Sequence, residues 1–103
     1  MVLLDSNNEE MTMPMVILTA DVKDGKAWER AYRSHGDLFK AAGIGAVDYT
    51  VGDDGHVVMC TDTDDVEGYM SFIKSKATQD AMKNDGVTRD TVKVFVLEKK
   101  FSP

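Results

Sequence analysis

Four ring side chains at helical spacing are the first candidates for chemistry in this chain. Trp28, Tyr32, His35 and Phe39 follow one another at intervals of four, three and four residues, which places their side chains on one stripe of a helix. His35 is therefore predicted to face an apolar interior. A partly buried imidazole tends to stay neutral near pH 7 and can accept a proton from a phenol or an enol-forming carbon acid. This makes His35 a candidate general base.

The same residues also have a structural interpretation. Rings at helical spacing usually form core, and a core histidine bonds one ring nitrogen to a backbone carbonyl or to a tyrosine. The alternative is a flat aromatic ligand stacked among the rings, with Tyr32 or Tyr49 orienting a substrate oxygen. The candidate catalytic residues are then His35 and Tyr32, and the candidate ligand-binding residues are Trp28, Tyr32, His35, Phe39, Tyr49, Met59 and Phe72.

No pattern typical of a metal or cofactor site is found in the sequence. The acidic run "DTDDVE" at 62–67 lacks the glycine and the spaced ligands of a calcium loop. Two histidines and one cysteine, far apart in the chain, do not form a zinc motif. The "GIG" at 43–45 follows a predicted helix, the reverse of a dinucleotide fingerprint. We therefore expect no metal and no cofactor.

Composition narrows the class of protein and its partners. A chain of 103 residues with 43% hydrophobic residues fits one compact domain. The net charge is -6, and without a long Lys/Arg run we expect neither nucleic acid nor an anionic membrane as a partner. No stretch approaches the roughly 20 apolar residues of a membrane span. The single cysteine, Cys60, cannot form a disulfide within the chain, which points to a reducing cytoplasm.

The elements that must position the ring residues can be predicted from turn and cap signals. Residues 1–14 carry no period and are interpreted as a flexible arm, with one domain over 15–103. The helix bearing the ring residues is expected over 25–42, capped by Asp24 and ended by Gly43. Asp64 and Glu67 resemble a capping box for a second helix, which should break near Ser75. The remaining elements are strands over 15–22, 46–51, 56–61 and 91–101, with a helical turn over 78–84 and a hairpin at Asp54-Gly55.

This order, β-α-β-β-α-β, predicts an α+β ferredoxin-like fold, in which two helices cover one face of a four-stranded antiparallel sheet. Alternation along the strands makes both faces of the sheet apolar. Helices cover one face only, so that Ile17, Val58, Phe95 and Leu97 would form an exposed patch on a single chain. We expect a homodimer through this open sheet face.

Residues 15–101 resemble the dimeric α+β barrel superfamily. The segments "AWERAYRSHGDLFKAAGI", "DDGHVVM", "DTDDVEGYMSFIKS" and "MKNDGV" are similar to small uncharacterised bacterial proteins related to the antibiotic biosynthesis monooxygenases. The resemblance implies two subunits packed sheet to sheet, each with a small cavity between its helices and its sheet. The superfamily includes cofactor-free oxygenases, lactone isomerases and haem-degrading enzymes, and some members with no known reaction.

Two functions follow from the stripe and the resemblance together. The first is a homodimer that binds a small, aromatic molecule without catalysis in a cavity between the first helix and the sheet. The second is a cofactor-independent monooxygenase or isomerase with His35 as general base. A haem-degrading function is not expected, because the strand "MVILTADV" at 15–22 lacks the asparagine that the haem-degrading relatives combine with tryptophan and histidine.

Overall fold

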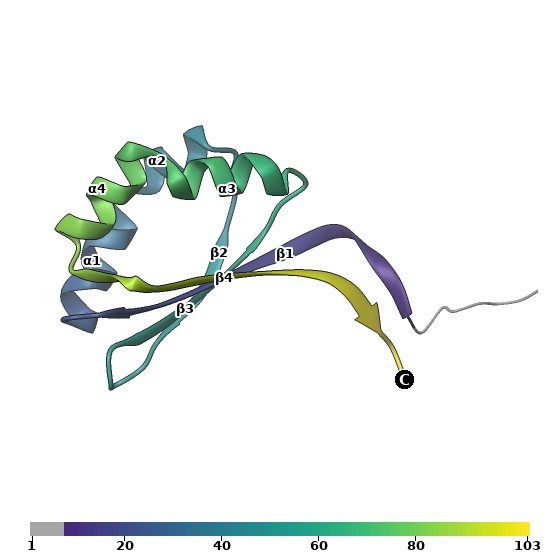
Figure 1. The fold of residues 1–103 in the computed structure, drawn as a ribbon, viewed down its shortest axis with the longest axis horizontal. Coiled ribbons are helices and arrows are strands. Elements are labelled where there is room, and N and C mark those ends of the chain that lie inside the picture. Colours follow the sequence, from purple (N-terminus) through teal and green to yellow (C-terminus); the bar gives the residue numbers. More distant parts are fainter. Residues whose placement is uncertain (1–7) are drawn as a thin grey trace, which may run out of the picture.

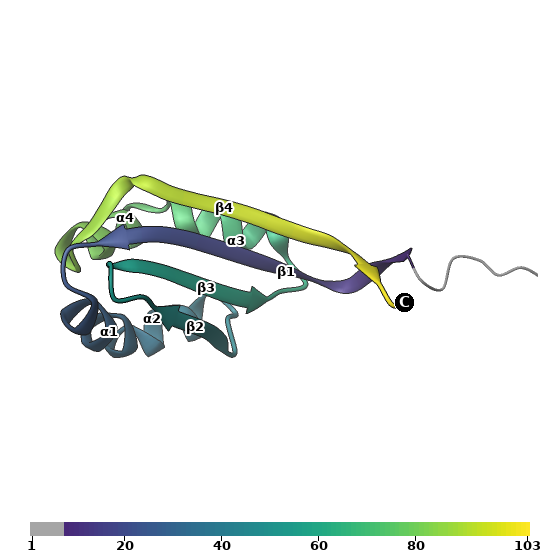
Figure 2. The ribbon, with the colours of Figure 1, turned by 90° about the horizontal axis from the view of Figure 1, so that it is seen from below.

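The computed structural model describes residues 8–103, which form one sheet with helices on a single face (Figure 1). The elements are β1 (Asn8–Val22), α1 (Gly25–Ser34), α2 (Gly36–Ala41), β2 (Val47–Val51), β3 (His56–Asp62), α3 (Val66–Lys74), α4 (Lys76–Asn84) and β4 (Val87–Phe101). The four strands are antiparallel to their neighbours, in the order β2-β3-β1-β4 (Figure 2). This is the predicted ferredoxin-like architecture, with the first predicted helix divided into α1 and α2 and the helical turn predicted over 78–84 extended to α4.

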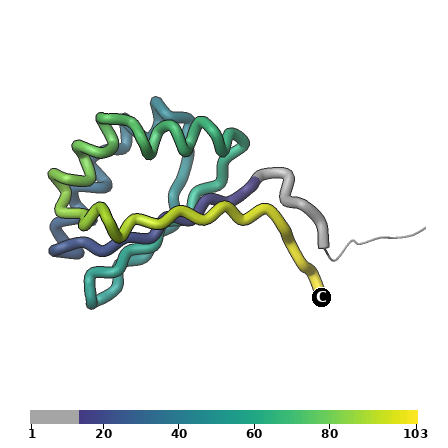
Figure 3. The backbone as a smooth tube through the Cα atoms, in the orientation of Figure 1, coloured from purple at the N-terminus to yellow at the C-terminus, as the bar shows by residue number. Residues whose placement is uncertain are grey.

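The strands alternate between a covered and an open face, as their sequences predict. Val16, Leu18 and Ala20 of β1 are buried, and the intervening residues are only half-buried. On the neighbouring strand β3, Val57 and Met59 are buried beneath the helices. The backbone trace shows both helix pairs on this side of the strands (Figure 3). The core therefore lies between the helices and one face of the sheet.

The opposite face of the sheet has no helix over it and exposes large apolar side chains. Val58, Phe95 and Leu97 retain 36%, 50% and 40% of their surface, as the sequence predicts. Ile17 is half-buried rather than exposed, because it lies between Cys60 of β3 and Phe95 of β4 in the strand register. The single chain thus carries an apolar open face.

Strands β1 and β4 are both longer than predicted, and β4 begins at Val87 rather than at Thr91. β1 begins at Asn8 rather than at Met15, so that residues 8–14, predicted as part of a flexible arm, belong to the strand, and residues 8–10 pair with residues 99–101 of β4. The register shifts between Glu10 and Met15, a segment that contains Pro14, which has no backbone N–H for the ladder. Residues 1–7 of the predicted arm lie outside the described part of the chain. The paired ends of β1 and β4 extend past the helices (Figures 1 and 2).

The continuous helix predicted over 25–42 is wrong. α1 ends at Ser34 and α2 begins at Gly36, with His35 between them at φ -92° and ψ 19°. The His35 N–H donates to the carbonyl of Tyr32, three residues back, over 3.1 Å. The next residue is glycine, which costs roughly 1 kcal/mol relative to alanine within a helix. The ring stripe is therefore interrupted at His35 itself.

The local signals at the other element ends are confirmed with one exception. Asp24 caps α1 by accepting from the N–H of Ala27 over 3.1 Å. The N-cap of α3 is Asp65, not Asp64, and its carboxylate accepts from the N–H of Gly68 over 2.9 Å. Ser75 ends α3 and caps α4. In the hairpin between β2 and β3, Gly55 has the predicted positive φ, 87°.

Candidate functional site

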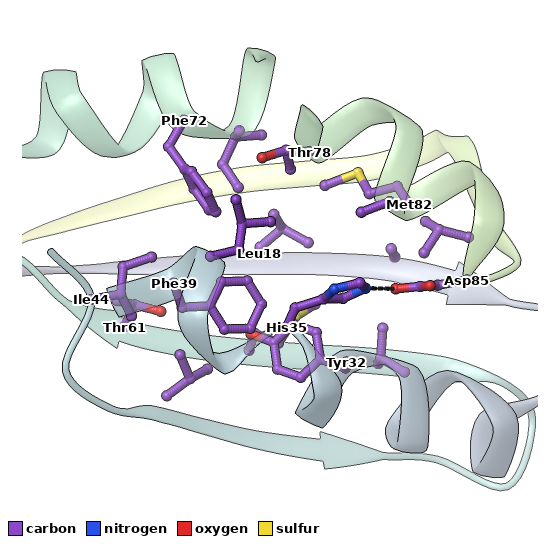
Figure 4. Close-up of a pocket in the computed structure, with 18 of the residues that line it drawn as sticks. Leu18, Tyr32, His35, Phe39, Ile44, Thr61, Phe72, Thr78, Met82 and Asp85 are labelled. Carbon is purple, nitrogen blue, oxygen red and sulfur yellow. Dashed lines mark hydrogen bonds and ion pairs between the residues drawn. The ribbon is translucent and has the colours of Figure 1, made fainter. Parts of the chain in front are cut away.

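A cavity of about 60 Å³ lies between the helices and the covered face of the sheet (Figure 4). Side chains from all four helices and all four strands line it. Most are aliphatic or aromatic, and the polar ones are Tyr32, His35, Thr61, Tyr69, Thr78 and Asp85. The cavity is thus an apolar chamber with few polar groups, which is the usual composition of a small-molecule site.

The predicted ring stripe forms an aromatic wall of this cavity. The ring of Trp28 stacks on that of Tyr32 with centroids 4.7 Å apart, and the Tyr32 ring lies 4.9 Å from that of Phe39. Phe72 of α3 meets Phe39 edge to face with centroids 6.1 Å apart. The wall therefore joins α1, α2 and α3 with rings at spacings typical of favourable aromatic pairs. Met59 of β3 also lines the cavity.

His35 lies at the joint between α1 and α2 and reaches across to the end of α4 (Figure 4). Its Nε2 lies 3.0 Å from Oδ2 of Asp85. The two side chains keep 29% and 11% of their surface, so this polar pair is largely shielded from solvent. Within residues 8–103, the second ring nitrogen, Nδ1, makes no hydrogen bond. The site thus holds an imidazole anchored at Nε2 by Asp85, with Nδ1 not bonded to any of residues 8–103.

Asp85 is the main functional candidate that sequence reasoning missed. Asp85 lies in the segment "MKNDGV" and directly follows the helical turn predicted over 78–84, which assigns it no functional role, and in the structure it is the C-cap residue of α4. Its partner is fifty positions away in sequence, and no local pattern connects residues so far apart. An aspartate before a glycine is common at the end of a helix because the pair suits the turn that follows. The sequence therefore gives no sign that Asp85 lines the cavity.

Two tyrosine hydroxyls in the cavity wall remain protonated. Burial raises the pKa of Tyr32 well above its ordinary value, with smaller contributions from the nearby Tyr69 and Tyr49. Burial likewise raises the pKa of Tyr69, against the opposing effect of a hydrogen bond with Thr61. A protonated phenol can donate a hydrogen bond to a ligand oxygen. Tyr32 therefore has the protonation state required of a residue that orients a substrate oxygen.

Tyr49 lies outside the cavity, behind the aromatic wall. Its ring contacts the Trp28 and Tyr32 rings, with centroids 6.0 and 5.8 Å away. Its hydroxyl donates to Glu29 over 2.6 Å and accepts from Nε of Arg33 over 2.7 Å. These two hydrogen bonds connect β2 to α1. They engage the Tyr49 hydroxyl with side chains of α1 that do not line the cavity. Of the predicted ligand-binding residues, Tyr49 is the one that the structure does not bring into the cavity.

A second hollow lies beside the cavity, between the α1–α2 joint and β2. It shares Tyr32, Phe39, Ile44 and Val47 with the cavity, so that the two are separated only by these side chains. Its rim includes Gly36, where a methyl group would meet no atom within 4 Å.

Among residues 8–103, no three His, Cys, Asp or Glu side chains are grouped as a metal site requires. In the same range, no helix is both long and apolar enough to cross a membrane.

The structure resembles solved proteins although the sequence matches none of the family models and no curated protein. A proposed antibiotic biosynthesis monooxygenase from Bordetella bronchiseptica superposes with a TM-score of 0.66 at 19% identity, covering 84% of this chain and 95% of that one. A second, from Nitrosomonas europaea, gives 0.63 at 16% identity, with 93% and 94% covered.

A third similar structure holds a ligand. It is a monooxygenase from the gene ActVA-Orf6 of Streptomyces coelicolor in complex with nanaomycin D, with a TM-score of 0.61 at 12% identity and coverage of 89% of this chain and 91% of that one. The chain described here has the same ferredoxin-like fold as these antibiotic biosynthesis monooxygenase-like proteins. The resemblance noted in the sequence is confirmed at the level of the fold.

Proposed function

We propose that the protein binds a small phenolic or enolic aromatic molecule in the cavity and that His35 removes its acidic proton. The observation that carries this proposal is the arrangement of the His35 imidazole, with Nε2 held by Asp85 and Nδ1 not bonded to any of residues 8–103, in the wall of an otherwise apolar chamber. An imidazole is the side chain best suited to accept a proton near neutral pH. The aromatic wall supplies the surface on which a flat ligand would stack.

The reaction class is a cofactor-independent oxygenation or isomerisation. Removing the proton of a phenol leaves an electron-rich anion that can itself reduce dioxygen. For a phenol oxidised to a quinone, one oxygen atom enters the ring as a carbonyl and the other leaves as water. The four electrons come from the substrate and dioxygen is the oxidant, so no external reductant is required. The monooxygenase from Streptomyces coelicolor, which shares the fold and was solved with nanaomycin D, supports this class by analogy.

Binding without turnover is the second candidate function. It is favoured by the position of Tyr49, whose hydroxyl is engaged by Glu29 and Arg33 outside the cavity. This leaves Tyr32 as the one tyrosine of the predicted pair that lines the chamber. A chamber with one acid–base pair and one orienting hydroxyl can hold a ligand whether or not it transforms it.

The active unit is a homodimer formed through the open sheet face. Val58, Phe95 and Leu97 are exposed on this face, and a second copy of the same face is the simplest apolar surface that would cover them. Pairing of identical faces gives a closed two-fold assembly with nothing left to add further subunits.

Oxygen consumption in the presence of a panel of phenols and hydroquinones tests the reaction. Native protein, His35→Gln and His56→Gln are compared, because the chain has two histidines and His56 is exposed on β3, outside the cavity. We expect native protein and His56→Gln to consume oxygen alike, and His35→Gln to be slower by about 100-fold or more.

Ligand binding is measured on the same three proteins by thermal shift, since a ligand that binds only the native state raises its stability. Binding without oxygen uptake in native protein would support the second candidate over the enzyme. Uptake that is unchanged in His35→Gln would overturn the role of His35 as base. If no member of the panel binds, both functions fail for phenolic ligands.

A further inference from the structure

We infer that Asp85 is a positioning residue for His35, which keeps the imidazole protonated at Nε2 and thereby assigns Nδ1 as the atom that accepts the substrate proton. This inference rests on the proposed function for its catalytic consequence. Its structural part, the position of the imidazole proton, concerns the protein without any ligand.

The tautomer follows from hydrogen-bond chemistry. An ionised carboxylate can only accept, whereas a neutral imidazole has one donating and one accepting nitrogen. With Nε2 of His35 3.0 Å from Oδ2 of Asp85, the favourable arrangement is an Nε2–H that donates to the carboxylate. The lone pair of the neutral ring is then on Nδ1, which makes no hydrogen bond within residues 8–103.

Asp85 is well placed to impose this orientation because its own backbone is fixed. Its N–H donates to the carbonyls of Ala81 and Lys83 at the end of α4. The next residue, Gly86, has a φ of 81°, a conformation that favours glycine and turns the chain into β4. Only 11% of the Asp85 side chain is exposed. A residue anchored at a helix end and covered on most sides restricts the imidazole to one geometry.

Charge balance in the cavity gives Asp85 a second effect on the proposed reaction. Among the residues that line the cavity, Asp85 is the one carboxylate, and no lysine or arginine is present. Proton transfer from a neutral phenol to His35 creates a cation and an anion in an apolar chamber, which is costly without a compensating partner. The Asp85 carboxylate lies against the imidazolium and stabilises it as the proton arrives, as acids do in other carboxylate–histidine pairs.

A purely structural role would have a different signature. The bond also links the α1–α2 joint to the end of α4, so that removing it lowers stability whichever role it has. A loss of stability therefore decides nothing. The position of the imidazole proton tests whether Asp85 fixes the tautomer. The separation of kcat from KM tests whether that tautomer serves catalysis, since a mere link between helices would leave kcat unchanged in folded protein.

Nitrogen-15 NMR of ligand-free protein, in which the two histidines are distinguished by His56→Gln, reads the tautomer directly. We expect Nε2–H at His35 in native protein. In Asp85→Asn the amide can either accept or donate, so we expect a mixture of the two tautomers. The control is Asp37→Asn, which removes an exposed carboxylate in the first turn of α2 and leaves the His35–Asp85 bond intact. It should retain the native signal.

Turnover of a phenol on which native protein consumes oxygen completes the experiment. Asp85→Asn should lower kcat by about 10–100-fold, with KM within about twofold because the aromatic wall is unchanged, and Asp37→Asn should match native protein. An Nδ1–H at His35 in native protein overturns the inference, and that measurement stands even if Asp85→Asn does not fold. The expected tautomer with native kcat in Asp85→Asn also overturns it. If native protein turns over no phenol, the proposed function fails, and the tautomer alone decides what Asp85 does.

Discussion

Trp28 contributes more to stability than any other single ring in the wall, because it is both the largest and the most deeply buried. It retains 2% of its surface and contacts two tyrosine rings. We expect Trp28→Ala to lower the free energy of unfolding by about 3–5 kcal/mol, measured by urea denaturation. Trp28→Phe, which keeps a ring on Tyr32, should lose less. If both variants lose the same free energy of unfolding, stacking on the Tyr32 ring does not account for the contribution of Trp28 to stability.

The two buried tyrosines predict how stability depends on alkaline pH. Burial raises the pKa of Tyr32 and Tyr69 in the folded state, whereas both ionise near about pH 10 in the unfolded chain. Above that pH the folded state holds more protons, so stability is fully present below about pH 10 and falls as the pH rises further. The slope reaches at most about 1.4 kcal/mol per pH unit for each tyrosine.

Urea denaturation between about pH 9 and about pH 11 measures this slope. Tyr32→Phe should reduce it, since one of the two buried hydroxyls is gone. Tyr49→Phe serves as the control, because the Tyr49 hydroxyl lies outside the cavity against Glu29 and Arg33. The same slope in native protein and in Tyr32→Phe would contradict the assignment of Tyr32 as a protonated group of the cavity.

At the residue scale, the sequence predicted one member of the polar pair and missed the other. His35 was found because helical spacing is a local property, and the stripe that it predicts does line the cavity. Asp85 could not be found in the same way, because its proximity to His35 depends on how α4 packs over the sheet. Tyr49 shows the converse limit. Strand alternation predicts that Tyr49 lies on the covered side of the sheet with Val47 and Val51. It does not predict whether the hydroxyl points into the cavity or toward α1.

Two glycines test what the backbone requires at two junctions between elements, Gly36 at the joint between α1 and α2 and Gly55 in the turn between β2 and β3. At Gly36 a methyl group would meet no atom within 4 Å, whereas at Gly55, with φ +87°, it would lie 2.6 Å from the carbonyl oxygen of Val22. We expect Gly36→Ala to stabilise the protein by about 0.5–1 kcal/mol. Gly55→Ala should destabilise it by about 1–2 kcal/mol or more.

Denaturant midpoints of the two variants, compared with native protein, provide the measurement. A destabilised Gly36→Ala would mean that the joint requires glycine for more than its low helix propensity. A neutral Gly55→Ala would mean that the turn between β2 and β3 can relax to accept a side chain. Because both changes add the same methyl group, their difference reports the positive φ of Gly55 and its close approach to Val22 rather than the added apolar surface.

The elements themselves were predictable where the signal is local. Asp24, Ser75 and Asp54-Gly55 mark element ends by cap and turn chemistry, and the structure agrees at each. The division of the first helix was not predicted, because the apolar spacing continues across His35 without a break in pattern. The N-terminal half of β1 was missed for another reason. Its residues show no sustained alternation of apolar and polar side chains, and their pairing is with β4, distant in sequence.

At the scale of the whole molecule, the single chain is more extended than its length requires. Its radius of gyration is 15.6 Å, against about 13 Å for a compact domain of this size. The paired ends of β1 and β4 account for this shape, since they continue beyond the helices (Figure 1). Together with the open sheet face, they leave much of the sheet without a cover from the same chain. That face was predictable from strand alternation, because the period of two holds on both sides of the sheet.

A substitution of the most exposed of the three apolar side chains Val58, Phe95 and Leu97 on the open face tests the proposed homodimer. Phe95 is half exposed and is paired with Ile17 in the register of β1 and β4, so that Phe95→Lys can fold as a single chain while placing a charge in the interface. Burying an unpaired charge and losing a ring in the interface should weaken the dimer by about 2 kcal/mol or more, or roughly 30-fold in Kd. Sedimentation at micromolar concentration should find native protein at twice the 11.4 kDa of one chain and Phe95→Lys shifted toward the monomer.

The matched control is Ser71→Lys, which adds the same charge on an exposed position of α3 on the helical side and should remain dimeric. Native protein that sediments as a well-folded monomer would contradict the assembly, because the apolar face would then be stable in water without a partner.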